Sequence, residues 1–178
     1  ANGKLKQALR NDSLVLCRHC GGVFGDPYQQ TDIHGSGFSI YFYGGSAWRW
    51  AYEYKFLYRP ARKNWFLVLE SQSSFSTSDP DMTIKESNIK EAELGEVTAS
   101  QFSSRPKYED SRWKVKAVKT NFYDSPETGS RPRKGYLVKG NTVTGIRHLK
   151  NFIEVSYDNG KAVITSGYLL KKDLVRIQ

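Results

Sequence analysis

Aromatic side chains occupy every second position over residues 48–58, and this run constrains the fold more than any other feature of the sequence. Successive side chains of a β-strand point to opposite faces, so this spacing places all the rings on one face of a long strand. Residues 38–43 alternate in the same way, and Pro60 to Asn64 turns the chain toward a further run at Trp65 to Leu69. We therefore predict an antiparallel meander with one aromatic face buried. The aromatic positions of the central strand are Trp48, Trp50, Tyr52, Tyr54, Phe56 and Tyr58.

The composition predicts β-structure in the rest of the chain as well. Eleven Tyr, nine Phe and four Trp occur in 178 residues, and aromatic residues favour strands. Between residues 71 and 111 only Val97 to Phe102 is typical of a strand, and Ile84 to Ala92 is the one candidate for a longer helix. The predicted fold class is all-β, with an antiparallel meander or sandwich-like domain first and a small barrel second. The strands expected in the barrel are 114–119, 135–138, 142–148, 152–157 and 161–166, with 174–177 closing the set.

The charge is distributed unevenly along the chain. Residues 1–110 contain 13 Lys or Arg and 13 Asp or Glu, whereas residues 111–178 contain 14 and 5, so the formal net charge of +9 belongs to the second part. We predict two domains, residues 1–108 and 112–178. A basic domain of this kind suits an anionic partner, and a solvated basic face that only aids solubility is the alternative.

The second part resembles the bacterial SH3-like (SH3b) domain. The resemblance rests on four segments in the family's order and spacing, and it covers about 65 residues. It implies a small SH3-like β-barrel that binds cell-wall peptides or other envelope components, usually in an exported protein. The segments are Val118-Lys-Thr-Asn-Phe-Tyr-Asp-Ser-Pro126, Arg133-Lys-Gly-Tyr-Leu-Val-Lys-Gly140, Ile153-Glu-Val-Ser-Tyr157 and Gly167-Tyr-Leu-Leu-Lys-Lys-Asp-Leu174.

The same resemblance implies a shallow ligand groove lined by tyrosines. A Tyr side chain presents a flat apolar ring and a hydrogen-bonding hydroxyl at a small entropic cost. A place in the core is the alternative for Tyr136 and Tyr168, which lie in expected strands, whereas Tyr123 and Asp124 lie on an expected loop. The groove residues expected are Tyr123, Asp124, Tyr136, Tyr157 and Tyr168.

The first part resembles a segment found in uncharacterised exported bacterial proteins, which implies an envelope location. The resemblance rests on Cys20-Gly-Gly-Val-Phe-Gly-Asp-Pro27, Tyr43-Gly-Gly-Ser-Ala-Trp-Arg-Trp50 and Lys63-Asn-Trp-Phe-Leu67. Within it, Arg49 between Trp48 and Trp50 could pair with a carboxylate or phosphate while the rings cover the ligand. The alternative is that Trp48 and Trp50 belong to the buried aromatic face.

Cys17 and Cys20 are the only cysteines, and their spacing leaves several possibilities open. A local disulfide in an oxidising compartment is the leading one, and a pair of buried thiols is another. A zinc site with His34 and a further ligand would need four ligands in all. A redox pair would need a βαβ setting, of which the sequence shows no sign. We expect no metal and no cofactor.

No pattern of catalytic residues is evident. The sequence has no nucleophile-elbow serine, no P-loop and no dinucleotide fingerprint. Asp26 and Glu53 are the carboxylate pair to inspect for glycoside hydrolysis. No apolar run is long enough to span a bilayer, and nucleic acid is not expected as a partner because its recognition motifs are missing.

We therefore expect a non-catalytic bacterial protein of the periplasm or another extracytoplasmic compartment. Its partner would be a cell-wall or envelope ligand, or an envelope protein. The alternative is an inhibitor or immunity-like protein that blocks an envelope-acting enzyme.

Overall fold

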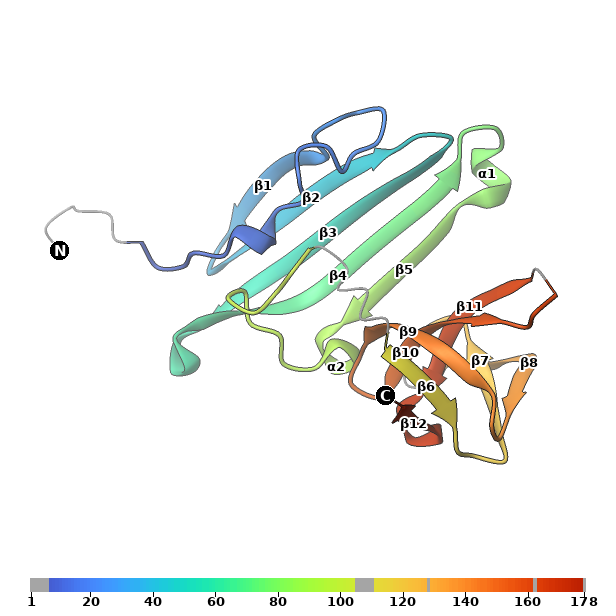
Figure 1. The fold of residues 1–178 in the computed structure, drawn as a ribbon. Helices are drawn as coiled ribbons and strands as arrows, with labels where there is room; N and C mark the ends of the chain where they lie inside the picture. The colour runs from blue at the N-terminus through green and yellow to red at the C-terminus, as the bar shows by residue number, and fades with distance from the viewer. Residues whose placement is uncertain (1–6, 105–110, 128, 162, 178) are drawn as a thin grey trace, which may run out of the picture. The chain divides into compact units, whose positions relative to one another are not determined.

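The computed structural model describes residues 7–104, 111–127, 129–161 and 163–177 (Figure 1). Its strands form two antiparallel sheets, which confirms the prediction of an all-β protein. The chain divides into two compact units, one made of Ala1–Glu91 with Glu96–Arg105 and the other of Ala92–Gly95 with Pro106–Gln178. The predicted domains end at residue 108 and begin at residue 112. Most of this boundary overlaps residues 105–110, which lie outside the described residues.

A five-stranded meander forms the first unit, with its strands in the order β1-β2-β3-β4-β5. The long aromatic run predicted from the alternation is β3, where Tyr54 and Phe56 are buried. One extra residue of β4 bulges out opposite Lys55 and Phe56. The elements are η1 (Asp12–Leu14), β1 (Tyr28–His34), β2 (Gly37–Gly45), β3 (Trp48–Arg59), η2 (Pro60–Arg62), β4 (Asn64–Ser76), α1 (Pro80–Thr83) and β5 (Lys85–Lys90).

Two predictions for the end of the first unit are wrong. The segment expected as a helix, Ile84 to Ala92, contains strand β5, and the Ser-rich residues 71–76 extend β4 to pair with it. Residues 97–102 form only an isolated bridge at Thr98, with Leu67 N donating to Val97 O at 2.9 Å. Backbone pairing explains the first result, because strands beside an established sheet need no apolar side chains to complete their hydrogen bonds.

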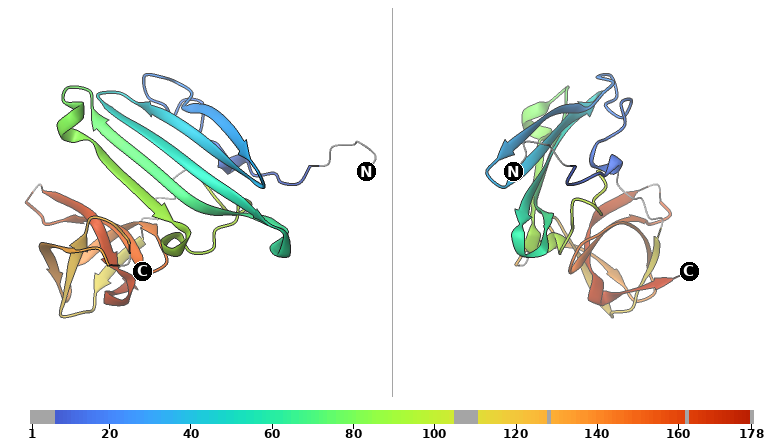
Figure 2. Two further views of the ribbon diagram at one scale, coloured as in Figure 1. Left: turned by 180° about the vertical axis from the view of Figure 1, so that it is seen from behind. Right: turned by 90° about the vertical axis from the view of Figure 1, so that its left-hand side faces the viewer.

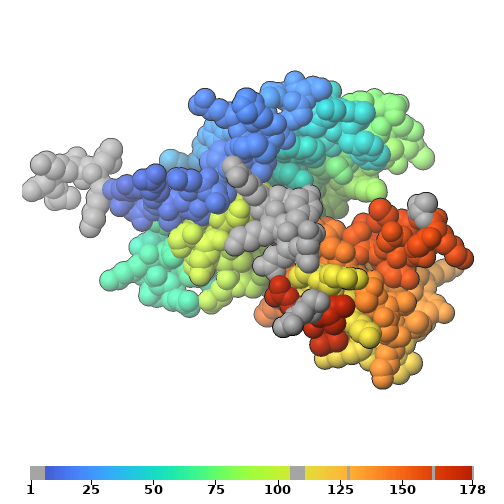
Figure 3. All heavy atoms as spheres, viewed as in Figure 1, coloured from blue at the N-terminus to red at the C-terminus, as the bar shows by residue number. Residues whose placement is uncertain are grey.

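One face of this sheet is covered by two irregular segments of the same unit, residues 7–16 and 96–104. The ring of Phe102 packs on Tyr54 and Phe56, with ring centroids 4.7 and 5.2 Å apart. Asn11 ties the segments together, since its Nδ2 donates to the carbonyl oxygens of Ala99 and Phe102, both at 2.7 Å. Figure 2 shows both segments on one side of the sheet, and Figure 3 shows their atoms side by side.

The second unit is a curled sheet of seven strands in the order β12-β6-β9-β10-β11-β7-β8. Figure 2 shows the strands curving around a common interior. The elements are α2 (Glu91–Leu94, of which Ala92–Leu94 belong here), β6 (Ser111–Val115), β7 (Lys119–Tyr123), β8 (Pro132–Val138), β9 (Thr142–His148), β10 (Phe152–Asp158), β11 (Ile164–Leu170), η3 (Lys171–Asp173) and β12 (Leu174–Ile177). The core inside the curve consists of Val115, Phe122, Leu137, Val143, Ile153, Val155, Leu169 and Leu174.

Candidate functional site

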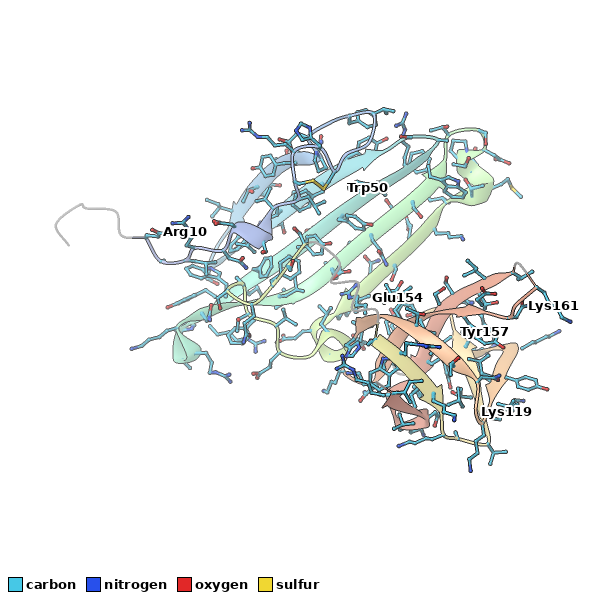
Figure 4. All side chains as sticks on the ribbon, viewed as in Figure 1. Arg10, Trp50, Lys119, Glu154, Tyr157 and Lys161 are labelled. Carbon is cyan, nitrogen blue, oxygen red and sulfur yellow. A yellow bond between two sulfur atoms is a disulfide. The ribbon has the colours of Figure 1, made fainter. Side chains whose placement is uncertain are left out.

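The start of β3 carries the first group of predicted site residues, Trp48, Arg49 and Trp50. Trp48 is 52% exposed, whereas Trp50 is half-buried and stacks on Tyr52 with 5.0 Å between centroids. Tyr52 stacks in turn on Tyr54 (Figure 4 labels Trp50). The rings of Trp50, Tyr52 and Tyr54 therefore stack along the strand and cover part of one another's faces, and Trp48 is not part of the stack.

Arg49 points away from both tryptophans because adjacent residues of a strand face opposite sides. Its Nη1 donates to the carbonyl oxygen of Gly45 at 3.1 Å, and its guanidinium carbon lies 4.6 Å from the centroid of the Phe24 ring. The guanidinium group therefore fastens the loop before β1 to the β2–β3 turn. The structure does not place Arg49 between two tryptophan rings.

A disulfide joins Cys17 and Cys20 in that same loop, with 5.2 Å between the Cα atoms. Just after it, Gly45 at the end of β2 donates its N–H to Gly21 O at 3.0 Å and accepts from Val23 N at 3.2 Å, which makes Gly22 its bridge partner. Both sulfurs are used in the disulfide, so neither is a thiolate ligand for zinc in this state. In the part of the chain that the structure describes, no three His, Cys, Asp or Glu side chains gather as a metal site.

Asp26 and Glu53, the carboxylates singled out for inspection, each have local partners. Asp26 accepts a hydrogen bond from the backbone N–H of Tyr28 at 3.0 Å. Glu53 Oε1 accepts from the hydroxyls of Ser39 at 2.9 Å and Tyr41 at 3.2 Å. The hydroxyl of Ser39 is also 3.2 Å from Nε2 of His34. This polar cluster lies on the face of the sheet opposite the Phe102 contacts.

Burial raises the pKa of the Tyr41 phenol above its ordinary value. The hydrogen bond with Ser39 opposes this shift, whereas the charges of Glu53 and Asp32 and the hydrogen bond with Glu53 add to it. Tyr41 is thus held in its neutral form, as expected for a phenol beside carboxylates.

The second group of predicted site residues lies in the curled sheet, where three tyrosines share its outer face. Tyr123 on β7 is the cross-strand partner of Tyr168 on β11. Tyr168 is only 6% exposed, and the Tyr123 ring meets Phe152 edge-on at 5.3 Å between centroids. Tyr136 lies on the terminal strand β8 and is 52% exposed. Tyr157 is partly buried against the core and so faces the interior.

Asp124 follows β7 and is exposed, with its carboxylate paired to Arg133 at 2.7 Å. Arg133 Nη1 also donates to the carbonyl oxygen of Ser166 at 2.7 Å. The guanidinium group thus links the loop after β7 to β8 and β11. Sequence reasoning singled out Asp124 but not Arg133, and no spacing rule would have paired them.

Lys119 completes the exposed surface around Tyr136. Its Nζ lies 4.2 Å from the centroid of the Tyr136 ring, within the range of a cation–π contact. Cross-strand pairing places Asn121 opposite Tyr136 and Lys119 opposite Val138, so these four residues share one patch. We call them the β7–β8 outer face (Figure 4 labels Lys119). The sequence signal for it is a stretch, residues 128–153, with six Lys or Arg and no Asp or Glu.

None of the helices in the described residues is long and apolar enough to cross a membrane. Comparison with protein-family models, with curated proteins and with solved structures found no match.

Proposed function

We propose that this protein is a non-catalytic, exported bacterial binding protein whose second unit takes an anionic cell-envelope ligand on the β7–β8 outer face. The observation that carries the proposal is the Lys119–Tyr136 pair, with a half-exposed ring beneath an ammonium group. The ring offers apolar contact and a hydroxyl, and the ammonium group offers charge. Carboxylate groups of cell-wall peptides fit this combination.

The surroundings of the face favour an anion. Arg131, Lys134 and Lys139 are exposed on or beside β8, and the carboxylate of Asp124 is neutralised by Arg133. Clustered charges of one sign attract a ligand over about a Debye length, roughly 8 Å at physiological salt. The basic surface would therefore raise the rate of encounter, and the Tyr136 ring would supply the short-range contact.

The resemblance to the bacterial SH3-like domain supports the same assignment. Its Tyr123-Asp-Ser-Pro126 turn and its Arg133 to Gly140 hairpin are the segments that border the β7–β8 outer face. The Cys17–Cys20 disulfide supports an extracytoplasmic location, because disulfides persist in oxidising compartments.

Co-sedimentation with purified peptidoglycan tests the proposal. Lys119→Glu and Tyr136→Ala should each weaken retention of the full chain by roughly tenfold or more, equivalent to about 1.4 kcal/mol. Lys172→Glu is the matched control, because it makes the same charge change at an exposed site in the same unit but outside the face. Peptidoglycan stripped of its stem peptides should retain less protein.

Two outcomes would contradict the proposal. The first is a wild-type chain that does not sediment with peptidoglycan at low salt. The second is equal retention of Lys119→Glu, Tyr136→Ala and Lys172→Glu, which would mean that the face makes no specific contact.

A further inference from the structure

Three segments meet at one end of the second unit. The connection between β6 and β7 lies in the middle, where Gly140 N donates to Val115 O and Lys116 N donates to Asp173 O, both at 2.9 Å. The β8–β9 turn and η3 therefore flank this connection. Figure 4 marks its position with Lys119, the first residue of β7. We call this surface the lysine-rich end, and its residues are Lys114, Lys116, Val118, Lys139, Lys172 and Val175, all of them exposed.

Lysines dominate the charge of this end. The segments 114–119, 138–141 and 171–175 contain six Lys, no Arg and one acidic residue, Asp173, so their formal charge is +5. The carboxylate of Asp173 accepts a hydrogen bond at 2.8 Å from the hydroxyl of Thr120, which is only 2% exposed. Within the part of the chain that the structure describes, none of the six lysines forms an ion pair. Their charge is therefore available to an anionic partner.

Exposed valines lie among these lysines. Val118 is 84% exposed and Val175 is 46% exposed. Val175 on β12 is the cross-strand partner of Lys114 on β6, so their side chains share one face of the sheet. Apolar side chains that stand in water among cations suit the surface of a bilayer, where the apolar groups enter the headgroup region and the ammonium groups meet lipid phosphates.

We propose that the lysine-rich end docks on the surface of an anionic phospholipid bilayer. Charge complementarity favours this partner, because each Lys near an anionic leaflet raises the affinity roughly fivefold. The ammonium group of Lys is a compact point charge that needs no fixed geometry from its partner, which suits mobile headgroups. Burial of Val118 and Val175 at the headgroup boundary adds to the attraction.

Two features favour the bilayer over a linear polyanion such as a nucleic acid. Arginine, which pairs with phosphate in bidentate geometry, is missing from the three segments. A phosphate chain would also leave Val118 in water, whereas lipid would cover it. The docking extends beyond the proposed cell-wall ligand, since Lys116, Val118 and Lys172 lie outside the β7–β8 outer face.

Co-sedimentation of the full chain with lipid vesicles tests the docking. Vesicles of phosphatidylglycerol and phosphatidylcholine, mixed at about one to three, should bind the wild type, and the binding should weaken as salt is raised. Vesicles of phosphatidylcholine alone should bind little. Lys116→Glu and Lys172→Glu should each weaken binding to the anionic vesicles by roughly tenfold or more, and Val118→Ser by roughly threefold.

Lys161→Glu is the matched control, because it makes the same charge change at an exposed site before β11, whereas η3 follows β11 (Figure 4 labels Lys161 and Lys119). The seven residues of β11 span roughly 20 Å, more than twice the Debye length at physiological salt, so this variant should bind vesicles as the wild type does. Tyr136→Ala should also keep vesicle binding, which separates the docking from retention on peptidoglycan. Far-ultraviolet circular dichroism checks that each variant folds.

Three outcomes would overturn the proposal. The first is a wild-type chain that does not bind the anionic vesicles at low salt. The second is a loss of vesicle binding in Lys161→Glu as large as that in Lys116→Glu, which would mean that only the total charge matters. The third is vesicle binding by Val118→Ser equal to that of the wild type, together with a single-stranded oligonucleotide that binds the wild type but not Lys116→Glu, which would assign this end to polyanions.

Discussion

Gly145 on β9 lies directly against the indole of Trp113 on β6. A Cβ atom built on Gly145 would lie 2.8 Å from both Nε1 of Trp113 and Oγ of Ser111. That indole nitrogen donates to the Ser111 hydroxyl at 3.0 Å, and the indole packs on the core of the second unit. We expect Gly145→Ala to lower the free energy of unfolding by about 1–3 kcal/mol, because the indole must shift to make room.

Denaturant unfolding monitored at the tryptophans measures this effect. Gly135→Ala is the matched control, since a Cβ there would meet no atom within 4 Å. Equal stabilities of the two variants would contradict the close approach between Gly145 and Trp113.

Asn11 holds the covering segments of the first unit in place with three hydrogen bonds. Its Nδ2 donates to two carbonyl oxygens, and its Oδ1 accepts from Ser13 N at 2.9 Å. Asn11→Asp keeps the size of the side chain but replaces the donor with an oxygen facing carbonyls. We expect a loss of about 2 kcal/mol in the free energy of unfolding, measured by chemical denaturation. Asp12→Asn nearby is the control, and a loss as large there would argue against the role of the Asn11 amide.

The contact between Glu53 and Tyr41 predicts how the pKa of Tyr41 responds to a substitution at Glu53. Because Glu53 adds to the raised pKa of Tyr41, Glu53→Gln should lower that pKa, while burial keeps it above the ordinary tyrosine value. The titration is followed by nuclear magnetic resonance of the Tyr41 ring. Glu86→Gln, a change of the same charge on β5, should leave the pKa of Tyr41 in place, and an unchanged pKa in Glu53→Gln would contradict the effect of the Glu53 charge.

The same shift has a consequence for stability at alkaline pH. The folded chain holds the Tyr41 proton more tightly than the unfolded chain does. Its contribution to stability is therefore fully present below the ordinary tyrosine pKa and is lost as the pH rises through the raised value.

Removing the Cys17–Cys20 disulfide should have a small effect. The bond closes a very short loop, so the entropy model assigns it about 2 kcal/mol at most. We expect the double variant Cys17→Ser with Cys20→Ser to remain folded, with a modest fall in melting temperature by calorimetry. Complete loss of folding would show that the loop's contacts with β2 depend on the bond.

The sequence predicted strands best where alternation was strong. Strand β3 follows from its aromatic positions, because one buried face imposes a period of two on the side chains. Strand β1 has no such signal, since nearly all its residues are exposed on both faces. Strand β5 is equally polar, and its sequence pattern predicts a helix. Edge strands are stabilised by backbone pairing to a sheet that single-sequence patterns do not contain.

The exposure of the candidate site residues could not be predicted from the sequence either, because it depends on the order of the strands. Tyr136 and Tyr168 both lie in strands and on the outer face, yet their exposures are 52% and 6%. Tyr168 belongs to an interior strand with neighbours on both sides, whereas Tyr136 belongs to a terminal strand. The sequence shows which residues alternate, but the order of strands decides which of them reach solvent. The ligand role of these tyrosines stays a prediction.

The division of the chain into two units affects how fragments of the protein can be expressed. The polypeptide passes from the first unit to the second at Ala92–Gly95, returns for Glu96–Arg105, and passes over again at Pro106. A fragment ended at Glu91 would lack Phe102 and the two carbonyl oxygens that Asn11 binds. A fragment ended at Arg105 keeps the whole first unit but also takes Ala92–Gly95 away from the second, so no single cleavage point leaves both units complete.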